Sequence, residues 1–185
     1  MKFSNRMKQL QTSIFNRLNE EKANLLAQGQ EIYDFTIGSP NIAPSKEIQN
    51  ALIEAAKDPV CYMYSLHDTM EFRETIRDWY AKRYDVALDP VNEILSLQGS
   101  QEGLAHIALA VCDPGDIVMI PSPCYPIFAN GPRIAGAQIY EMPMLKEYDY
   151  LIQFDKIPED IAKKAKMMII SYPNNPTGAT APDWF

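Results

Sequence analysis

Hydrophobic residues in the first half of the chain recur three and four positions apart, which is the spacing of amphipathic helices. This pattern predicts a helix that ends near Gly29, a second helix over residues 45–57, and a third that begins at about Met70 and ends before Asp85. The residues expected to face inward on the third helix are Phe72, Ile76, Trp79 and Tyr80. The first half of the chain is therefore predicted to be mainly helical, apart from EIYDFTI, residues 31–37, a short β-rich run that is broken at Gly38-Ser39-Pro40.

The pattern changes near residue 90, where short apolar runs alternate with helical segments. The runs predicted to be strands are EILSLQ, DIVMI, AQIYEMPM and MMIIS. Strands that alternate with helices at this spacing indicate parallel crossovers and an α/β sheet flanked by helices. We therefore predict two regions, an N-terminal arm with helices over residues 1–89 and part of an α/β domain over residues 90–185. The last strand, residues 167–171, is expected to have no neighbouring strand in this chain.

Composition limits the classes of function. The chain has 185 residues, of which 46% are hydrophobic and 22% charged, as in a globular protein with a core. Its formal net charge of -7 argues against a nucleic-acid partner, because binding to the phosphate backbone depends on clustered Lys and Arg. The apolar runs are too short for a membrane span. Three cysteines without a C-x-x-C pair argue against a disulfide framework or a zinc site and favour a reducing cytosol.

The first 19 residues carry four basic residues and no acidic residue, a composition superficially similar to that of an organellar presequence. Apolar residues at helical spacing occur in the same stretch, and it continues into the helix-favouring NEEKANLLAQG. A structural helix is therefore favoured over a cleaved leader.

The turn LQGSQEGL, residues 97–104, lies between a predicted strand and a predicted helix. Gly99 permits a tight turn and Ser100 is a good helix N-cap, so the N–H groups of Ser100, Gln101 and Glu102 are expected to be free for a phosphate. The turn matches neither the dinucleotide-binding fingerprint nor the P-loop. Taken alone, it is equally explained as a capped helix start.

Two later turns follow predicted strands. In PSPCYPIF, residues 121–128, three prolines constrain the backbone around Tyr125, whose ring could stack on a flat ligand or belong to the core. In YPNNPTG, residues 172–178, Asn175 precedes a proline and is held in extended geometry, so its amide could donate to a ligand oxygen. Ligands of open α/β sheets bind beyond the carboxyl ends of the strands. Together the three turns suit a flat aromatic molecule with a phosphate and a phenolic oxygen, such as pyridoxal 5'-phosphate.

The order of GSQEGL, SPCYP and YPNNPTG resembles the class I/II aminotransferases of pyridoxal-phosphate fold type I. The longer stretches YSLHDTMEFRETIRDWYAKRYDV and ILSLQGSQEGLAHIALAVCDPGD are similar to the subgroup around LL-diaminopimelate aminotransferase. The resemblance covers essentially all of residues 30–180. It implies an N-terminal helical arm followed by part of the family's large domain, whose mainly parallel sheet is flanked by helices.

The resemblance assigns cofactor-binding roles to four residues. Ser100 and Gln101 would hold the phosphate through backbone N–H and side-chain groups. Tyr125 would stack on the pyridine ring, and Asn175 would donate to the phenolic oxygen of the ring.

Two further residues follow from the resemblance. Tyr64 resembles the tyrosine that crosses the family's dimer interface to the cofactor phosphate of the neighbouring subunit, and Gly38 resembles a backbone position near the substrate carboxylate. Members of the family often carry a glycine shortly after this tyrosine, whereas this chain reads HDTMEFR and is one residue shorter. The resemblance also implies a homodimer of the full-length protein.

The activity implied is transfer of an amino group between an amino acid and a 2-oxo acid in the cytoplasm. YPNNPTG lies mid-chain in the family, so the sequence is expected to be a truncated N-terminal part that lacks the Schiff-base lysine, and Lys163, Lys164 and Lys166 are expected at a solvated helix end. The 185-residue chain is therefore predicted to be inactive, with no catalytic residue and no metal ligand. The alternatives are a C–S lyase or decarboxylase on the same fold, and a non-catalytic remnant or interaction fragment.

Overall fold

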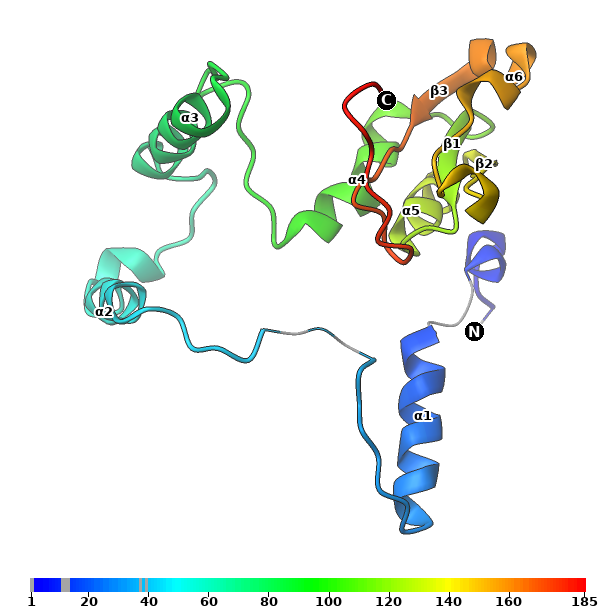
Figure 1. Cartoon of the computed structure of the whole chain (residues 1–185). Coiled ribbons are helices and arrows are strands. Elements are labelled where there is room, and N and C mark those ends of the chain that lie inside the picture. Colours follow the sequence, from blue (N-terminus) through cyan, green and yellow to red (C-terminus); the bar gives the residue numbers. More distant parts are fainter. Residues whose placement is uncertain (1, 11–13, 37, 39) are drawn as a thin grey trace. The chain divides into compact units, whose positions relative to one another are not determined.

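The structure is a computed structural model that describes residues 2–10, 14–36, 38 and 40–185. The chain divides into two compact units, one formed by residues 1–12 and 97–185 and the other by residues 13–96 (Figure 1). The division after residue 96 lies close to the change of pattern near residue 90. The assignment of 1–89 and 90–185 to separate parts of the complete fold stays a prediction.

The unit of residues 13–96 is mainly helical, as the sequence predicted, but the described residues of the predicted β-rich run, 31–36, form no strand. Its α-helices are α1 (Ile14–Ala27), α2 (Lys46–Ala55) and α3 (Met70–Tyr84). The Thr69 hydroxyl caps α3 by accepting a hydrogen bond from the backbone N–H of Phe72 at 3.3 Å. Asp85 ends α3 in the left-handed conformation, with φ of 54°. These local signals are why the predicted ends of α3 agree with the structure.

The residues predicted to face inward on α3 are not buried within this unit. Phe72, Trp79 and Tyr80 are exposed, and Ile76 is half-buried. The ring of Trp79 contacts the rings of Tyr80 and Tyr84, each at a centroid distance of 5.3 Å. Periodicity identifies residues that share a face of a helix, but it does not identify what covers that face.

The unit of residues 1–12 and 97–185 contains a three-stranded parallel sheet in the order β2-β1-β3. The strands are β1 (Ile117–Ser122), β2 (Gln138–Pro143) and β3 (Ala165–Met168). The α-helices of this unit are α4 (Ser100–Val111), α5 (Ile127–Ala135) and α6 (Glu159–Lys164). The 3-10 helices of the two units are η1 (Asn5–Gln9), η2 (Pro59–Tyr62), η3 (Lys146–Tyr148) and η4 (Phe154–Lys156). Among the described residues, none of the helices combines the length and the apolar character needed to cross a membrane.

Two strand predictions need correction. Residues 93–98 form no strand, and Leu95 is 80% exposed, because an apolar run becomes a strand only where another strand pairs with it. The last strand begins and ends earlier than residues 167–171, and it does have a neighbour: it pairs with β1 in parallel. The backbone N–H of Ile169 extends this pairing by donating to the carbonyl of Met119 at 2.9 Å.

The core of this unit is built on both faces of β1. Val118 and Ile120 point to one face and pack in a cluster with Phe128 of α5 and Ala137. Met119 points to the other face and packs in a second cluster. The buried members of that cluster are Met119, Met142, Met144 and Ile152. The central strand is therefore buried on both sides, which is typical of a strand in a parallel sheet.

Helices α4 and α5 approach each other closely at Gly131 of α5. A Cβ atom at this position would lie 2.7 Å from the carbonyl oxygen of Leu104 and 3.1 Å from that of Ala105. Both neighbours are backbone atoms of α4 and cannot move without shifting the helix. The absence of a side chain at Gly131 therefore sets the spacing between α4 and α5.

Substitution of Gly131 by Ala should destabilise the full-length protein by about 1–3 kcal/mol, because the added methyl group pushes α5 away from the backbone of α4. Gly103→Ala is the matched control. Its Cβ would meet only the exposed side chain of Leu97, whose Cδ1 atom would lie at 2.6 Å, and this side chain can turn away. The control should be neutral or stabilising by about 0.5 kcal/mol through helix propensity. Urea unfolding measures both values, and equal destabilisation by the two substitutions would contradict the proposed close contact.

Candidate functional site

The first predicted turn leads into α4. Gly99 precedes this helix with φ of 83°, a conformation that favours glycine, and it occupies the N-cap position. Ser100 was expected to be the N-cap, but it is the first residue of the helix and α4 has no side-chain cap. The N–H groups of Ser100 and Gln101 have no partner within the helix, since the first turn of an α-helix provides none.

The backbone N–H of Glu102 was expected to be free, but it forms a hydrogen bond within the turn. This N–H donates to the carbonyl of Gly99 at 3.1 Å. The Glu102 carboxylate accepts a hydrogen bond from the backbone N–H of Gln98 at 2.5 Å. The negative charge of Glu102 is thus bound to the turn that precedes the helix, and two N–H groups rather than three are available at the helix start.

The second turn, after β1, lies against the first. The Tyr125 hydroxyl donates to Oε1 of Gln101 at 2.9 Å, and this bond joins the turn after β1 to the first turn of α4. The Tyr125 ring is half-buried and meets Phe128 edge to face, at a centroid distance of 6.3 Å. Two contacts therefore orient this ring, one through its hydroxyl and one through its edge.

The third turn follows β3 and contains two asparagines with different environments. Asn174 is 3% exposed, and its Nδ2 donates to Thr177 Oγ1 at 3.0 Å and to the carbonyl of Pro123 at 3.5 Å. Asn175 is exposed. The sequence singled out Asn175 and missed the buried role of Asn174, because nothing in the pair NN distinguishes a buried amide from an exposed one.

Two side-chain hydrogen bonds thus connect the three turns: Gln101 with Tyr125, and Asn174 with Pro123. The structure brings together the donors that a phosphate needs, a ring able to stack and an exposed amide next to Asn174. This set of groups fits the cofactor that the resemblance implies, because a phosphate and a phenolic oxygen accept hydrogen bonds and an aromatic ring has a flat face.

Tyr64 and Gly38 lie in the unit of residues 13–96 and are not among the groups that these bonds bring together. Tyr64 is 89% exposed, and Gly38 is also exposed. The residues on either side of Gly38 lie outside the described part of the chain.

Cys124 lies beside Tyr125 in the second turn and is a poor nucleophile. Burial, followed by the negative charge of Glu141, raises the pKa of its thiol above the ordinary value. The protonated thiol is the unreactive form. In the part of the chain that the structure describes, no cluster of three or more His, Cys, Asp or Glu side chains could hold a metal ion.

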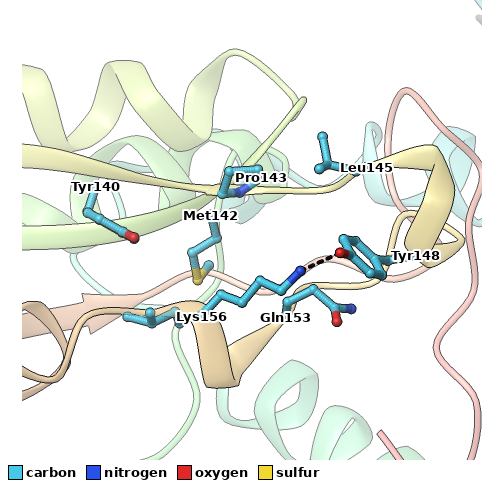
Figure 2. A pocket seen from close by; sticks show the side chains of 8 residues that line it. Tyr140, Met142, Pro143, Leu145, Tyr148, Gln153 and Lys156 are labelled. Atoms are coloured by element: carbon cyan, nitrogen blue, oxygen red, sulfur yellow. Dashed lines mark hydrogen bonds between the residues drawn. The ribbon is translucent and has the colours of Figure 1, made fainter.

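A separate cavity of about 190 Å³ lies between β2 and the segment that carries η3 and η4, and Figure 2 shows its lining. Met142 contributes an apolar wall, and Lys156 Nζ donates to the Tyr148 hydroxyl at 2.5 Å. This hydrogen bond raises the pKa of Lys156. None of the residues predicted for the site lines this cavity.

Known protein sequences are similar to this chain over nearly its whole length. The sequence matches the family model described as aminotransferase class I and II over residues 7–183. It is 41% identical over 177 residues to the LL-diaminopimelate aminotransferase of Syntrophobacter fumaroxidans, a match that covers 95% of this chain and 46% of that protein. The LL-diaminopimelate aminotransferase of Aquifex aeolicus is 43% identical over 178 residues, with coverage of 96% and 46%. The chain spans about half the length of the curated relatives it matches.

Solved structures agree with this match. Substrate-bound BacF from Bacillus subtilis is similar with a TM-score of 0.89 and 31% identity, over 98% of this chain and 47% of that one. A probable N-succinyldiaminopimelate aminotransferase from Thermus thermophilus gives a TM-score of 0.84 and 37% identity, over 92% and 46%. These similarities confirm the predicted fold class.

The two asparagines of the third turn should respond differently to substitution. Asn174→Ala removes a buried amide that bonds to Thr177 within the third turn and joins this turn to Pro123, so it should lower the free energy of unfolding by about 1–2 kcal/mol. This loss lies in the lower part of the range for a buried hydrogen-bonding side chain, because the substitution also removes Asn174 Oδ1, which is buried and has no hydrogen-bond partner among the described residues. Asn175→Ala, at an exposed position, should change stability by less than about 0.5 kcal/mol. Thermal and urea unfolding of the full-length variants measure the difference, and equal effects would contradict the distinct environments.

Proposed function

This chain belongs to the aminotransferase class I and II family, and we propose that it forms the N-terminal part of an enzyme that transfers an amino group between an amino acid and a 2-oxo acid. The family depends on pyridoxal 5'-phosphate, the cofactor predicted from the sequence. The observation that carries the proposal is the junction of the three turns through the Gln101–Tyr125 and Asn174–Pro123 hydrogen bonds.

Four residues of these turns would hold the cofactor. The Ser100 hydroxyl and the N–H groups of Ser100 and Gln101 would donate to its phosphate at the positive end of the α4 dipole. The Tyr125 ring would stack on the pyridine ring, and the Asn175 amide would donate to the phenolic oxygen. When bound, the cofactor supplies an electron sink for the negative charge that develops on the substrate.

Gln101 would have two functions at once. Its Oε1 accepts a hydrogen bond from the Tyr125 hydroxyl, so the other end of the amide, Nε2, is the end left to donate. A phosphate oxygen accepts such a donor, whereas it would repel Oε1. The hydrogen bond to Tyr125 therefore orients Gln101 correctly for an anion and orients the stacking ring at the same time.

The remaining groups of the proposed site are the covalent lysine, Tyr64 and Gly38, and they lie outside the three turns. We assign the covalent lysine of the family to a segment outside residues 1–185. Lys163 and Lys164 lie on the exposed helix α6 and form ion pairs with Glu159 at 2.5 Å and Asp160 at 3.7 Å. Lys166, which was expected at the end of the same helix, is instead an exposed residue of β3. The full-length protein would be a cytoplasmic homodimer in which Tyr64 contacts the cofactor phosphate of the neighbouring subunit. Gly38 would lie near the substrate carboxylate.

The activity is tested with the full-length protein. Because curated relatives are named LL-diaminopimelate aminotransferases, we expect amino-group transfer from LL-diaminopimelate to a 2-oxo acid, dependent on added pyridoxal 5'-phosphate. Release of CO₂ or of a thiol in place of transfer would instead indicate a decarboxylase or a C–S lyase. Liquid chromatography with mass spectrometry of the product mixture distinguishes the three reactions.

The phosphate role of Ser100 gives a second test. Ser100→Ala should raise the Kd for pyridoxal 5'-phosphate by roughly ten- to a hundredfold, the effect of losing one charge-assisted hydrogen bond of about 1.5–3 kcal/mol. The Kd for pyridoxal, which has no phosphate, should not change. Ser4→Ala is the control, because Ser4 is exposed and its side chain makes no cap bond to η1. An unchanged Kd for pyridoxal 5'-phosphate in Ser100→Ala would contradict the phosphate role of Ser100 and leave this turn only as the start of α4.

A further inference from the structure

Tyr64 projects from a short segment whose upstream end is well held. This end is η2, where the Asp58 carboxylate accepts a hydrogen bond from the backbone N–H of Val60 at 2.9 Å. The Tyr62 hydroxyl donates to the carbonyl of Ala56, at the end of α2, at 2.7 Å. Tyr64 itself is 89% exposed. The segment therefore leaves a fixed base only two residues before Tyr64.

The downstream end is held by Asp68, which belongs to the shortened stretch HDTMEFR. The Asp68 carboxylate accepts two hydrogen bonds from Ser96, 28 residues further along the chain: one from its backbone N–H at 3.2 Å and one from its hydroxyl. These bonds lower the pKa of Asp68 below its ordinary value. The next residue, Thr69, caps α3. Residues 63–67 are thus the only part of the segment between the two held ends.

A cation reinforces this downstream end. Arg73 Nε lies 3.8 Å from Asp68 Oδ2, and the side chains of Arg73 and Asp68 are only 15% and 19% exposed. The same guanidinium donates to the carbonyl of Val91 at 3.5 Å. Arg73 Nε is buried and has no hydrogen-bond partner among the described residues, so the Asp68 carboxylate is the charge that compensates it. Loss of Asp68 would release Ser96 and leave a mostly buried cation without its counter-charge.

We propose that Asp68 is a positioning residue that holds the segment of residues 63–67 so that Tyr64 reaches the cofactor phosphate bound by a second copy of this chain. This inference rests on the proposed function, in which Tyr64 acts across the dimer. A residue that must reach another subunit needs an exposed tip, and an ordered tip on a short segment needs both ends fixed. Within the segment, the Ser65 hydroxyl donates to the carbonyl of His67 at 2.5 Å and shortens its free part further.

The test uses the full-length dimer and compares the Kd values for pyridoxal 5'-phosphate and pyridoxal. Tyr64→Phe should weaken pyridoxal 5'-phosphate binding by about tenfold, the loss of one hydrogen bond to a charged group, and Asp68→Ala should reproduce much of this loss. Neither substitution should change the Kd for pyridoxal by more than about twofold. The double variant should bind pyridoxal 5'-phosphate with about the same affinity as the single variant that binds it less tightly, because both substitutions remove the same contact. Glu71→Ala, which removes one exposed carboxylate from the start of α3, should change neither Kd.

The possible outcomes separate this inference from the proposed function. If Tyr64→Phe weakens the phosphate-dependent affinity but Asp68→Ala does not, or if the two losses add, the role of Asp68 is wrong while that of Tyr64 stands. If Tyr64→Phe has no effect, the cross-subunit role of Tyr64 is wrong and this inference is wrong with it. If Asp68→Ala does not fold, Ser96→Ala keeps the ion pair with Arg73 and takes its place, with the same expected loss. Equal loss of affinity for pyridoxal would show a general structural defect and overturn the proposal.

Discussion

The burial of β1 on both faces is the constraint on which the candidate site depends. Its alternating side chains belong to two separate clusters, with Val118 and Ile120 in one and Met119 in the other, so the strand can neither rotate nor shift its register without exposing apolar surface. The strand must therefore end where its apolar run ends, at Ser122. The turn that follows carries Tyr125 at a position determined by the core below it.

Polar contacts then connect what the core has placed. Gln101 and Tyr125 come from different turns, and each satisfies the other through one hydrogen bond. Asn174 makes a comparable connection between the third turn and Pro123, and it does so from a buried position where an unpaired amide is costly. Buried polar groups of this kind favour one arrangement over its alternatives. The position of the exposed Asn175 thus follows from the burial of its neighbour.

The unit of residues 13–96 is held together in a different way. It has few buried side chains and several exposed aromatic ones, such as Trp79 and Tyr84 on α3. Its order comes from caps and from the pairing of Asp68 with Ser96 and Arg73. Local hydrogen bonds can define the path of a chain without a large core, but they leave apolar side chains uncovered. The surface that this unit exposes is consistent with a chain that spans about half the length of its relatives.

The sequence by itself determined those features whose causes are local. The ends of α3 follow from Thr69 and Asp85, β1 follows from the continuous apolar run IVMI, β2 follows from the short stretch QIYEMP, and the motif order is enough to identify the family. Tertiary structure decided the rest. Residues 93–98 have the apolar pattern of a strand but pair with no other strand among the described residues, whereas β3 pairs with β1. Ser100 has the chemistry of an N-cap, but the turn places Gly99 there. Asn174 and Asn175 are chemically identical, and only packing against Pro123 buries one and exposes the other. Pairing, capping and burial depend on neighbours that are distant in the sequence, and a single sequence does not contain their positions.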